Sequence, residues 1–231
     1  MQGNSVERKW FSFFGNMRNK YNMRVSATKP IILFLDAKNS SKNNGNLLKE
    51  SENDFFSALE LASKYFSEVY NCMSLCGTDE ISFIIESSTV FIDSINNKRN
   101  FRTHDIVSIF SQYFFEYFNS IYEGETVYWH CKCFNIAREK INSYIRFKSN
   151  GIQKGVTSIF LKKKGVKNAY GIKLKDKLEM CKQYPEYSAI QEYKDGIFYY
   201  RGKKTSLDEY YNRGINDKAL DFFDLEEFDN L

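Results

Sequence analysis

Two patterns of apolar residues take turns along the first 136 residues of the chain: short continuous runs, and residues spaced three or four positions apart. Short continuous apolar runs are typical of buried strands, whereas apolar residues spaced three or four apart predict helices with one buried stripe. The order is strand, helix, strand-turn-strand, helix, strand, which is the split βαβ arrangement of ferredoxin-like folds. The pattern predicts strands at residues 31–36, 69–75, 81–85 and 126–136, and helices at 53–68 and 103–122.

We therefore expect an α+β fold with an antiparallel sheet and helices on one face. Pro30 begins the first strand, where its missing N–H is harmless. Asn53 or Asp54 is placed to cap the first helix.

Acidic side chains stand where two of the predicted strands end. Asp36 follows the apolar run 31–35, and Asp79 and Glu80 occupy the turn of the predicted hairpin. Carboxylates that meet at one sheet edge can bind hard cations such as Mg²⁺, and a pair of such ions can assist phosphoryl transfer. From the spacing alone, the alternative is that Asp79 and Glu80 are turn residues and that Asp36 only ends a strand.

From residue 138 onward the pattern changes. Helical segments are expected at 139–148 and at 156–164, with Gly151 and Gly155 interrupting them and Gly165 ending the second. We further predict a helix over 174–184, a β-hairpin arm with a basic tip over 196–204, and an acidic tail over 217–231. The expected division of the chain is an N-terminal helical segment, 1–29, a palm-like catalytic core, 30–137, and a C-terminal extension, 138–231.

Composition narrows the class of protein. The 231 residues include 21 Phe and 16 Tyr, enough aromatic volume to build a packed core. The net charge of +4 is compatible with a polyanionic partner without requiring one. The five Cys show no metal-ligand spacing, so we expect reduced thiols in a cytoplasmic protein. No apolar run is long enough for a membrane span.

Several short motifs resemble those of the tRNA-histidine guanylyltransferase family, in its guanylyltransferase-like 3′–5′ RNA polymerase branch. GTDEISF at residues 77–83 is similar to the family's S-D-E-x-S hairpin, and PIILFLDAK at 30–38 is similar to its first acidic strand. Weaker similarities lie in GNMRNKY at 15–21, CFNI at 133–136, YGIK at 170–173 and YRG at 200–202. The sequence thus looks like a divergent member.

The resemblance implies a polymerase/cyclase palm that adds nucleotides to the 5′ end of tRNA or a similar RNA, using GTP or ATP. By the same resemblance, Asp36, Asp79 and Glu80 are catalytic, and Asp36, Asp79 and the Ala37 carbonyl hold two Mg²⁺ ions. A homo-oligomer, dimer or tetramer, is also implied. The implied nucleotide-binding residues are Ala37, Lys38, Asn39, Ser40, Ser41 and Thr78.

The sequence departs from the family pattern at Phe34, Ala37 and Asp105, and the W-R-Q block of the family is almost lost near residues 146–154. Two alternatives therefore stay open: a palm that makes a nucleotide signal from triphosphates without RNA, and a non-catalytic RNA-binding module. Contacts with RNA phosphates are predicted at the basic residues Arg18, Lys148, Lys154, Arg201 and Lys203.

Overall fold

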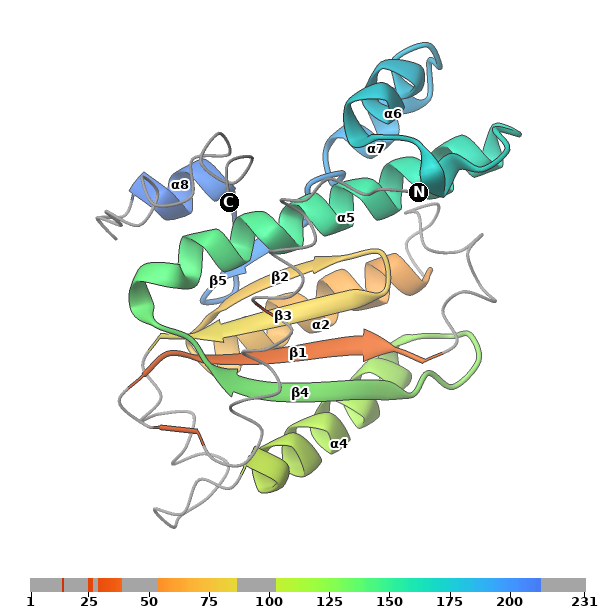
Figure 1. Cartoon of the computed structure of the whole chain (residues 1–231). Helices are drawn as coiled ribbons and strands as arrows, with labels where there is room; N and C mark the ends of the chain where they lie inside the picture. The colour runs from red at the N-terminus through yellow and green to blue at the C-terminus, as the bar shows by residue number, and fades with distance from the viewer. Residues whose placement is uncertain (1–13, 15–24, 27–28, 39–53, 87–102, 213–231) are drawn as a thin grey trace.

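The structure of the chain is a computed structural model, and it describes residues 14, 25–26, 29–38, 54–86 and 103–212. Within these ranges, six strands form one sheet in the order β4-β1-β3-β2-β5-β6, and every neighbouring pair is antiparallel. Figure 1 shows the sheet with helices packed in front of it and behind it. The strands are β1 (Ile31–Ala37), β2 (Met73–Gly77), β3 (Glu80–Ile85), β4 (Trp129–Asn135), β5 (Ile197–Tyr200) and β6 (Lys203–Thr205).

The predicted α+β fold is confirmed, with β1 in the interior of the sheet between β4 and β3. All seven residues of β1 are buried except Asp36, which is partly exposed. An apolar strand that is covered on both faces needs a continuous apolar run, and residues 31–35 supply it.

Two amphipathic helices cover one face of the sheet, α2 (Phe55–Val69) and α4 (Thr103–Ile121). Asp54 caps α2, because its carboxylate accepts a hydrogen bond of 2.8 Å from the Ser57 amide. Their buried stripes meet the sheet in an aromatic core that includes Phe66, Phe110 and Phe114.

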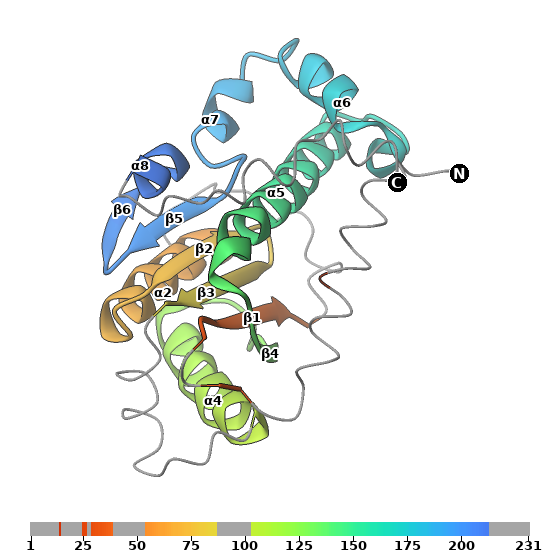
Figure 2. The ribbon, with the colours of Figure 1, turned by 60° about the vertical axis from the view of Figure 1, so that its left-hand side comes forward.

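The opposite face of the sheet is crossed by α5 (Ile141–Lys163), as Figures 1 and 2 show from two sides. The prediction that Gly151 and Gly155 interrupt this helix is wrong, because one continuous helix runs through both. Gly151 faces open space, whereas a Cβ at Gly155 would lie 3.0 Å from Thr78 Cγ2. Gly155 therefore permits the close approach of α5 to the β2–β3 turn, and Gly165, with φ +83°, follows the end of α5 as expected.

The C-terminal hairpin does not stand out as a separate arm. Its first strand, β5, pairs with β2, so residues 197–205 extend the same sheet that holds the acidic strand ends. None of the described helices is long and apolar enough to cross a membrane. The remaining short helices are η2 (Arg138–Lys140), η3 (Ala169–Gly171), α6 (Leu174–Cys181), α7 (Tyr187–Gln191) and α8 (Leu207–Asn212).

Candidate functional site

The structure brings the two acidic strand ends to the same edge of the sheet. Strands β1 and β3 pair so that Asp36 lies directly opposite Glu80. One residue further along, the Ala37 amide donates a hydrogen bond of 2.9 Å to the backbone oxygen of Asp79. The end of β1 is thereby joined to the β2–β3 turn, and this arrangement sets the positions of the Asp36 and Asp79 carboxylates.

Backbone strain at Thr78 shapes the two-residue turn that presents Asp79. Thr78 has φ +52°, a left-handed conformation that is unfavourable for a β-branched residue. Its buried hydroxyl hydrogen-bonds to the Gly77 carbonyl oxygen at 2.7 Å and to Asp79 Oδ1 at 3.0 Å. Strain of this kind is found more often at functional sites than elsewhere.

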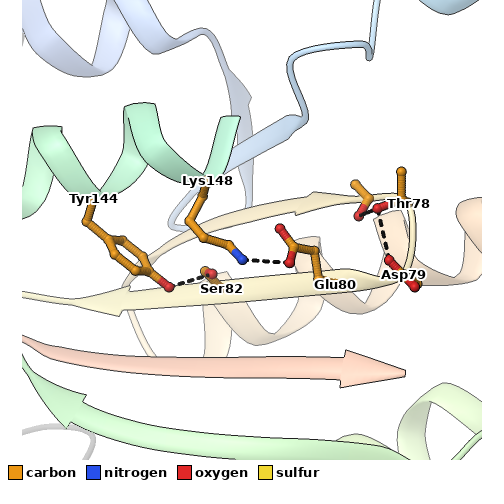
Figure 3. A network of polar contacts seen from close by, with 7 residues as sticks. Thr78, Asp79, Glu80, Ser82, Tyr144 and Lys148 are labelled. Atoms are coloured by element: carbon orange, nitrogen blue, oxygen red, sulfur yellow. Dashed lines mark hydrogen bonds and ion pairs between the residues drawn. The ribbon is translucent and has the colours of Figure 1, made fainter. Parts of the chain in front are cut away.

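Helix α5 packs against the start of the same turn. Ile152 packs so closely on Gly77 that a Cβ there would lie 2.3 Å from Ile152 Cγ2. Earlier along the same side of α5, Tyr144 and Ser82 share a hydrogen bond of 3.0 Å between their hydroxyls. The helix therefore follows β3 from its middle to the turn, and Figure 3 shows the Tyr144–Ser82 contact near the middle of the strand.

Between those contacts, Lys148 of α5 reaches Glu80. Lys148 Nζ lies 2.6 Å from Glu80 Oε2 and 3.9 Å from the centre of the Phe34 ring. In Figure 3 the Glu80 carboxylate points toward α5, while Asp79 stands at the tip of the turn. Alternation along β1 puts Phe34 and Asp36 on one face, so Lys148, Glu80 and Asp36 share the α5 face of the sheet.

Electrostatic interactions connect the acidic residues. Burial raises the pKa of Asp36, and the Asp79 carboxylate raises it further, while Lys148, His130 and Lys132 oppose the shift. Burial also raises the pKa of Glu80, and the Lys148 ammonium opposes that shift. Asp36 and Asp79 are thus close enough to repel each other, which is the condition that a bound cation relieves.

Tyr170 is a neighbour of the site to which the sequence motifs assigned no role. It lies in η3, with 57% of its surface exposed. Partial burial and the nearby Asp79 carboxylate raise the pKa of its phenol. The only sequence signal was its place in the YGIK motif, which does not indicate proximity to a turn about ninety residues earlier.

The predicted nucleotide-binding residues are described only in part. Ala37 and Thr78 are both buried, whereas Lys38 is exposed and its amide donates to the Tyr128 carbonyl oxygen at 2.8 Å. Asn39, Ser40 and Ser41 lie outside the described residues, as does Arg18 of the predicted RNA-binding set.

The RNA-binding prediction needs a correction at Lys148. Only 8% of this residue is exposed and its ammonium contacts Glu80, so it does not present a charge to RNA at the surface. The basic side chain alone was the ground for predicting a phosphate contact, but it lies on the sheet-facing stripe of α5.

The other predicted RNA contacts lie in two places. Lys154 is on α5 next to Gly155, which approaches the β2–β3 turn of Thr78 and Asp79 (the acidic turn). Arg201 and Lys203 are exposed at the β5–β6 turn, and the Arg201 amide bonds to Cys72, just before β2 begins. The acidic turn follows the other end of β2, so these two cations are separated from it by the five-residue strand, roughly 16 Å.

Two carboxylates, those of Asp36 and Asp79, are oxygen ligands available for a metal at this edge of the sheet. Within the described ranges, no group of three or more His, Cys, Asp and Glu side chains is arranged to hold a metal ion. Asp36 and Asp79 nevertheless fit Mg²⁺, which is often held by one or two carboxylates together with waters and substrate phosphates. Both are oxygen donors, and their mutual repulsion favours a cation between them.

A cavity of about 470 Å³ lies elsewhere, between α5, α6 and α7. Among its lysines, Lys182 is paired with Glu179 and Lys194 with Asp195, so acidic neighbours compensate part of its positive charge. None of the predicted catalytic residues lines it. We therefore place the candidate site at the sheet edge that holds Asp36, Asp79 and Glu80 (the acidic edge) and not in this cavity, because the edge joins the strained turn to paired carboxylates.

The sequence matches no protein-family model and no curated protein. Its fold, however, matches solved structures along most of the chain. A bacterial tRNA(His) guanylyltransferase-like protein in complex with GTP superimposes with a TM-score of 0.59, 15% identity, and coverage of 96% of this chain and 100% of that one. The corresponding structure in complex with ATP gives 0.57, 16%, and coverage of 81% and 82%.

The tRNA(His) guanylyltransferase from Saccharomyces cerevisiae superimposes with a TM-score of 0.53 at 17% identity, over 83% of this chain and 94% of that chain. Identities this low establish common architecture, and function has to be argued from the site. The resemblance seen in the motifs is therefore confirmed for the fold: this chain has the palm-type fold of the tRNA(His) guanylyltransferase-like proteins.

Proposed function

We propose that this protein is a metal-dependent nucleotidyltransferase that adds nucleotides to the 5′ end of tRNA or a similar RNA. The observation that supports this most is the convergence of Asp36 and Asp79 at one sheet edge, on a fold shared with proteins solved with ATP and GTP. The proposal includes a nucleoside triphosphate as substrate and an RNA 5′ end as acceptor.

Asp36, Asp79 and the Ala37 carbonyl are the groups that would hold Mg²⁺. Bound there, the metal would neutralise phosphate charge and lower the barrier to phosphoryl transfer. The protein's own contribution is positional. The hydrogen bond between the Ala37 amide and Asp79 holds the two strand ends together, and the Thr78 hydroxyl orients the Asp79 carboxylate. Glu80 is not included in this set, because its carboxylate is bonded to Lys148.

Lys38 and Lys154 are suitably placed for phosphates, since one follows β1 directly and the other stands beside the acidic turn on α5. Arg201 and Lys203, about one strand length away, would contact a more distant part of a long RNA. Binding through such contacts should weaken steeply as salt is raised.

The test is incorporation of labelled GTP or ATP into 5′-truncated tRNA in the presence of Mg²⁺. We expect Asp36→Asn and Asp79→Asn each to lower the rate at least about 10²-fold, the scale of losing one preorganised electrostatic group. Glu123→Gln, an exposed carboxylate in the loop after α4, is the matched control and should keep the wild-type rate. Absence of incorporation by well-folded wild-type protein with any triphosphate would argue against the proposal.

The two alternatives predict different outcomes of the same assay. A palm that makes a nucleotide signal would consume triphosphate with no RNA present. A non-catalytic module would bind RNA equally well with and without Asp36 and Asp79, and it would incorporate no label.

A further inference from the structure

Lys148 places a positive charge inside the acidic edge. It is almost completely covered, although lysine is seldom buried without a partner. The Glu80 carboxylate lies 2.6 Å from its ammonium, and the Phe34 ring centre lies 3.9 Å from it. An aromatic face attracts a cation, so two contacts from two different strands hold the ammonium in place.

The Lys148 ammonium lies where the register of β1 and β3 brings two carboxylates together. Asp36 and Glu80 are directly opposite each other on antiparallel strands, and like charges in such a pair destabilise a sheet. Asp79 adds a third carboxylate next to Asp36. Lys148 opposes the upward pKa shift of both Asp36 and Glu80, so its field reaches both members of the pair.

The contact with Lys148 separates Glu80 from its neighbour Asp79 in direction. Asp79 projects from the tip of the turn, whereas Glu80 faces α5 and is engaged by Lys148 (Figure 3). Among the described residues, Asp36, Asp79 and Glu80 do not form a three-carboxylate group arranged for a metal ion.

We propose that Lys148 is a positioning residue that acts as a built-in counter-ion, holding Glu80 out of the metal-binding set so that Asp36 and Asp79 bind divalent ions without it. This inference rests on the proposed function, in which those two aspartates hold the metal. It assigns Glu80 to a charge pair within the protein and not to metal coordination.

The experiment measures Mn²⁺ affinity by titration calorimetry for wild-type protein and for the variants K148M, K148R, E80Q and K148M/E80Q. K148M removes a nearby positive charge and releases Glu80, so Mn²⁺ should bind at least about tenfold more tightly. K148R keeps the charge and should stay within about threefold of wild type. E80Q removes a negative charge beside the ammonium and should therefore weaken Mn²⁺ binding.

The double variant K148M/E80Q is the decisive comparison, because it removes one positive and one negative charge together. Replacing both members of a buried ion pair is often neutral for stability, so this variant should fold even where K148M does not. With Glu80 outside the metal set, K148M/E80Q should bind Mn²⁺ within about threefold of wild type. Thermal unfolding of each protein verifies that it is folded.

Two results would overturn the inference while leaving the proposed function intact: a K148M affinity equal to wild type, or a loss of more than about tenfold in folded K148M/E80Q, which would make Glu80 a ligand. Failure of every folded protein to bind Mn²⁺ would instead contradict the proposed function, and the inference would fall with it.

Discussion

The two faces of the sheet are built from different chemistry. The face under α2 and α4 is aromatic, and Phe66, Phe83, Phe110 and Phe114 lie with ring centres 5.4 to 6.3 Å apart where they contact one another. The face under α5 contains polar pairs, such as Ser82 with Tyr144 and Glu80 with Lys148. Because both faces are buried, burial does not distinguish them. They differ in how strongly their interactions, aromatic contacts on one face and polar pairs on the other, depend on the distance and angle between the partners.

Apolar contacts tolerate small shifts, whereas a hydrogen bond or ion pair loses its value when its partners move apart. The aromatic face therefore supplies mainly non-directional stability, and the polar pairs on the α5 face hold specific atoms in specific places. Neighbouring residues on one strand serve the two purposes, since Phe83 packs on α2 and α4 while Ser82 bonds to α5. Substitutions on the two faces should therefore have different signatures.

The largest loss of stability is expected from Phe114→Ala on the aromatic face. Phe114 is fully buried, with the Trp129 ring centre 4.9 Å away. Removing its ring should lower the free energy of unfolding by about 3–5 kcal/mol, through lost transfer energy and the cavity left behind. Denaturant unfolding measures the change. Phe115→Ala, one residue along and only partly buried, should have a clearly smaller effect.

Much of this architecture follows from the hydrophobic pattern. The first four strands and the two helices between them were predicted within a few residues, because buried stripes at helical and strand spacing leave little choice. Asp36 and Asp79 could be proposed as neighbours because the split βαβ order brings the end of β1 to the edge of the sheet that holds the β2–β3 turn. Local period and strand order therefore suffice for this part of the fold.

The α5 face was harder to predict. Glycine lowers helix propensity, so Gly151 and Gly155 indicated breaks, yet packing on the sheet keeps the helix continuous. The charge of Lys148 suggested a surface residue, because sequence does not show that a carboxylate and a phenyl ring lie directly below it. Pairings between residues more than sixty positions apart depend on how α5 is placed, and local pattern does not encode that placement.

Gly77→Ala should be the next most disruptive change. The new methyl would lie 2.3 Å from Cγ2 of Ile152, a β-branched side chain with little rotamer freedom in a helix. We expect a loss of about 1–3 kcal/mol from overpacking, together with weaker Mn²⁺ binding as the acidic turn shifts. Chemical denaturation and Mn²⁺ titration measure the two effects.

Gly151→Ala provides the control for that change. It makes the same substitution within α5, where nothing lies within 4 Å of the added methyl. Helix propensity should then stabilise the protein by about 0.5–1 kcal/mol. Equal effects of the two substitutions would contradict the difference between the close packing of Ile152 on Gly77 and the open space beside Gly151.

A loss of similar size is expected from Tyr144→Phe. The substitution keeps the ring but removes the hydroxyl that shares a hydrogen bond of 3.0 Å with the buried Ser82 hydroxyl. Losing one partner of a buried pair should lower the free energy of unfolding by about 1–3 kcal/mol. Adding Ser82→Ala should have less effect in this variant than in the wild type, and a double-mutant cycle measures the difference. Strict additivity would mean that the two hydroxyls do not interact.

Asp36→Asn should have the smallest effect on stability, and it should stabilise the protein where the substitutions of Phe114, Gly77 and Tyr144 destabilise it. Burial and the Asp79 carboxylate raise the pKa of Asp36 above its ordinary value of 3.8. A carboxyl whose pKa is raised by folding stabilises the protein below its unfolded pKa, and this contribution is lost as pH rises through the folded pKa. In metal-free buffer, the asparagine variant should therefore melt at a higher temperature than wild type at pH 7, with a smaller advantage near pH 4. A variant less stable than wild type at pH 7 would contradict this reasoning. If the same variant also loses Mn²⁺ binding, then the repulsion between Asp36 and Asp79 is a stability penalty maintained for a function.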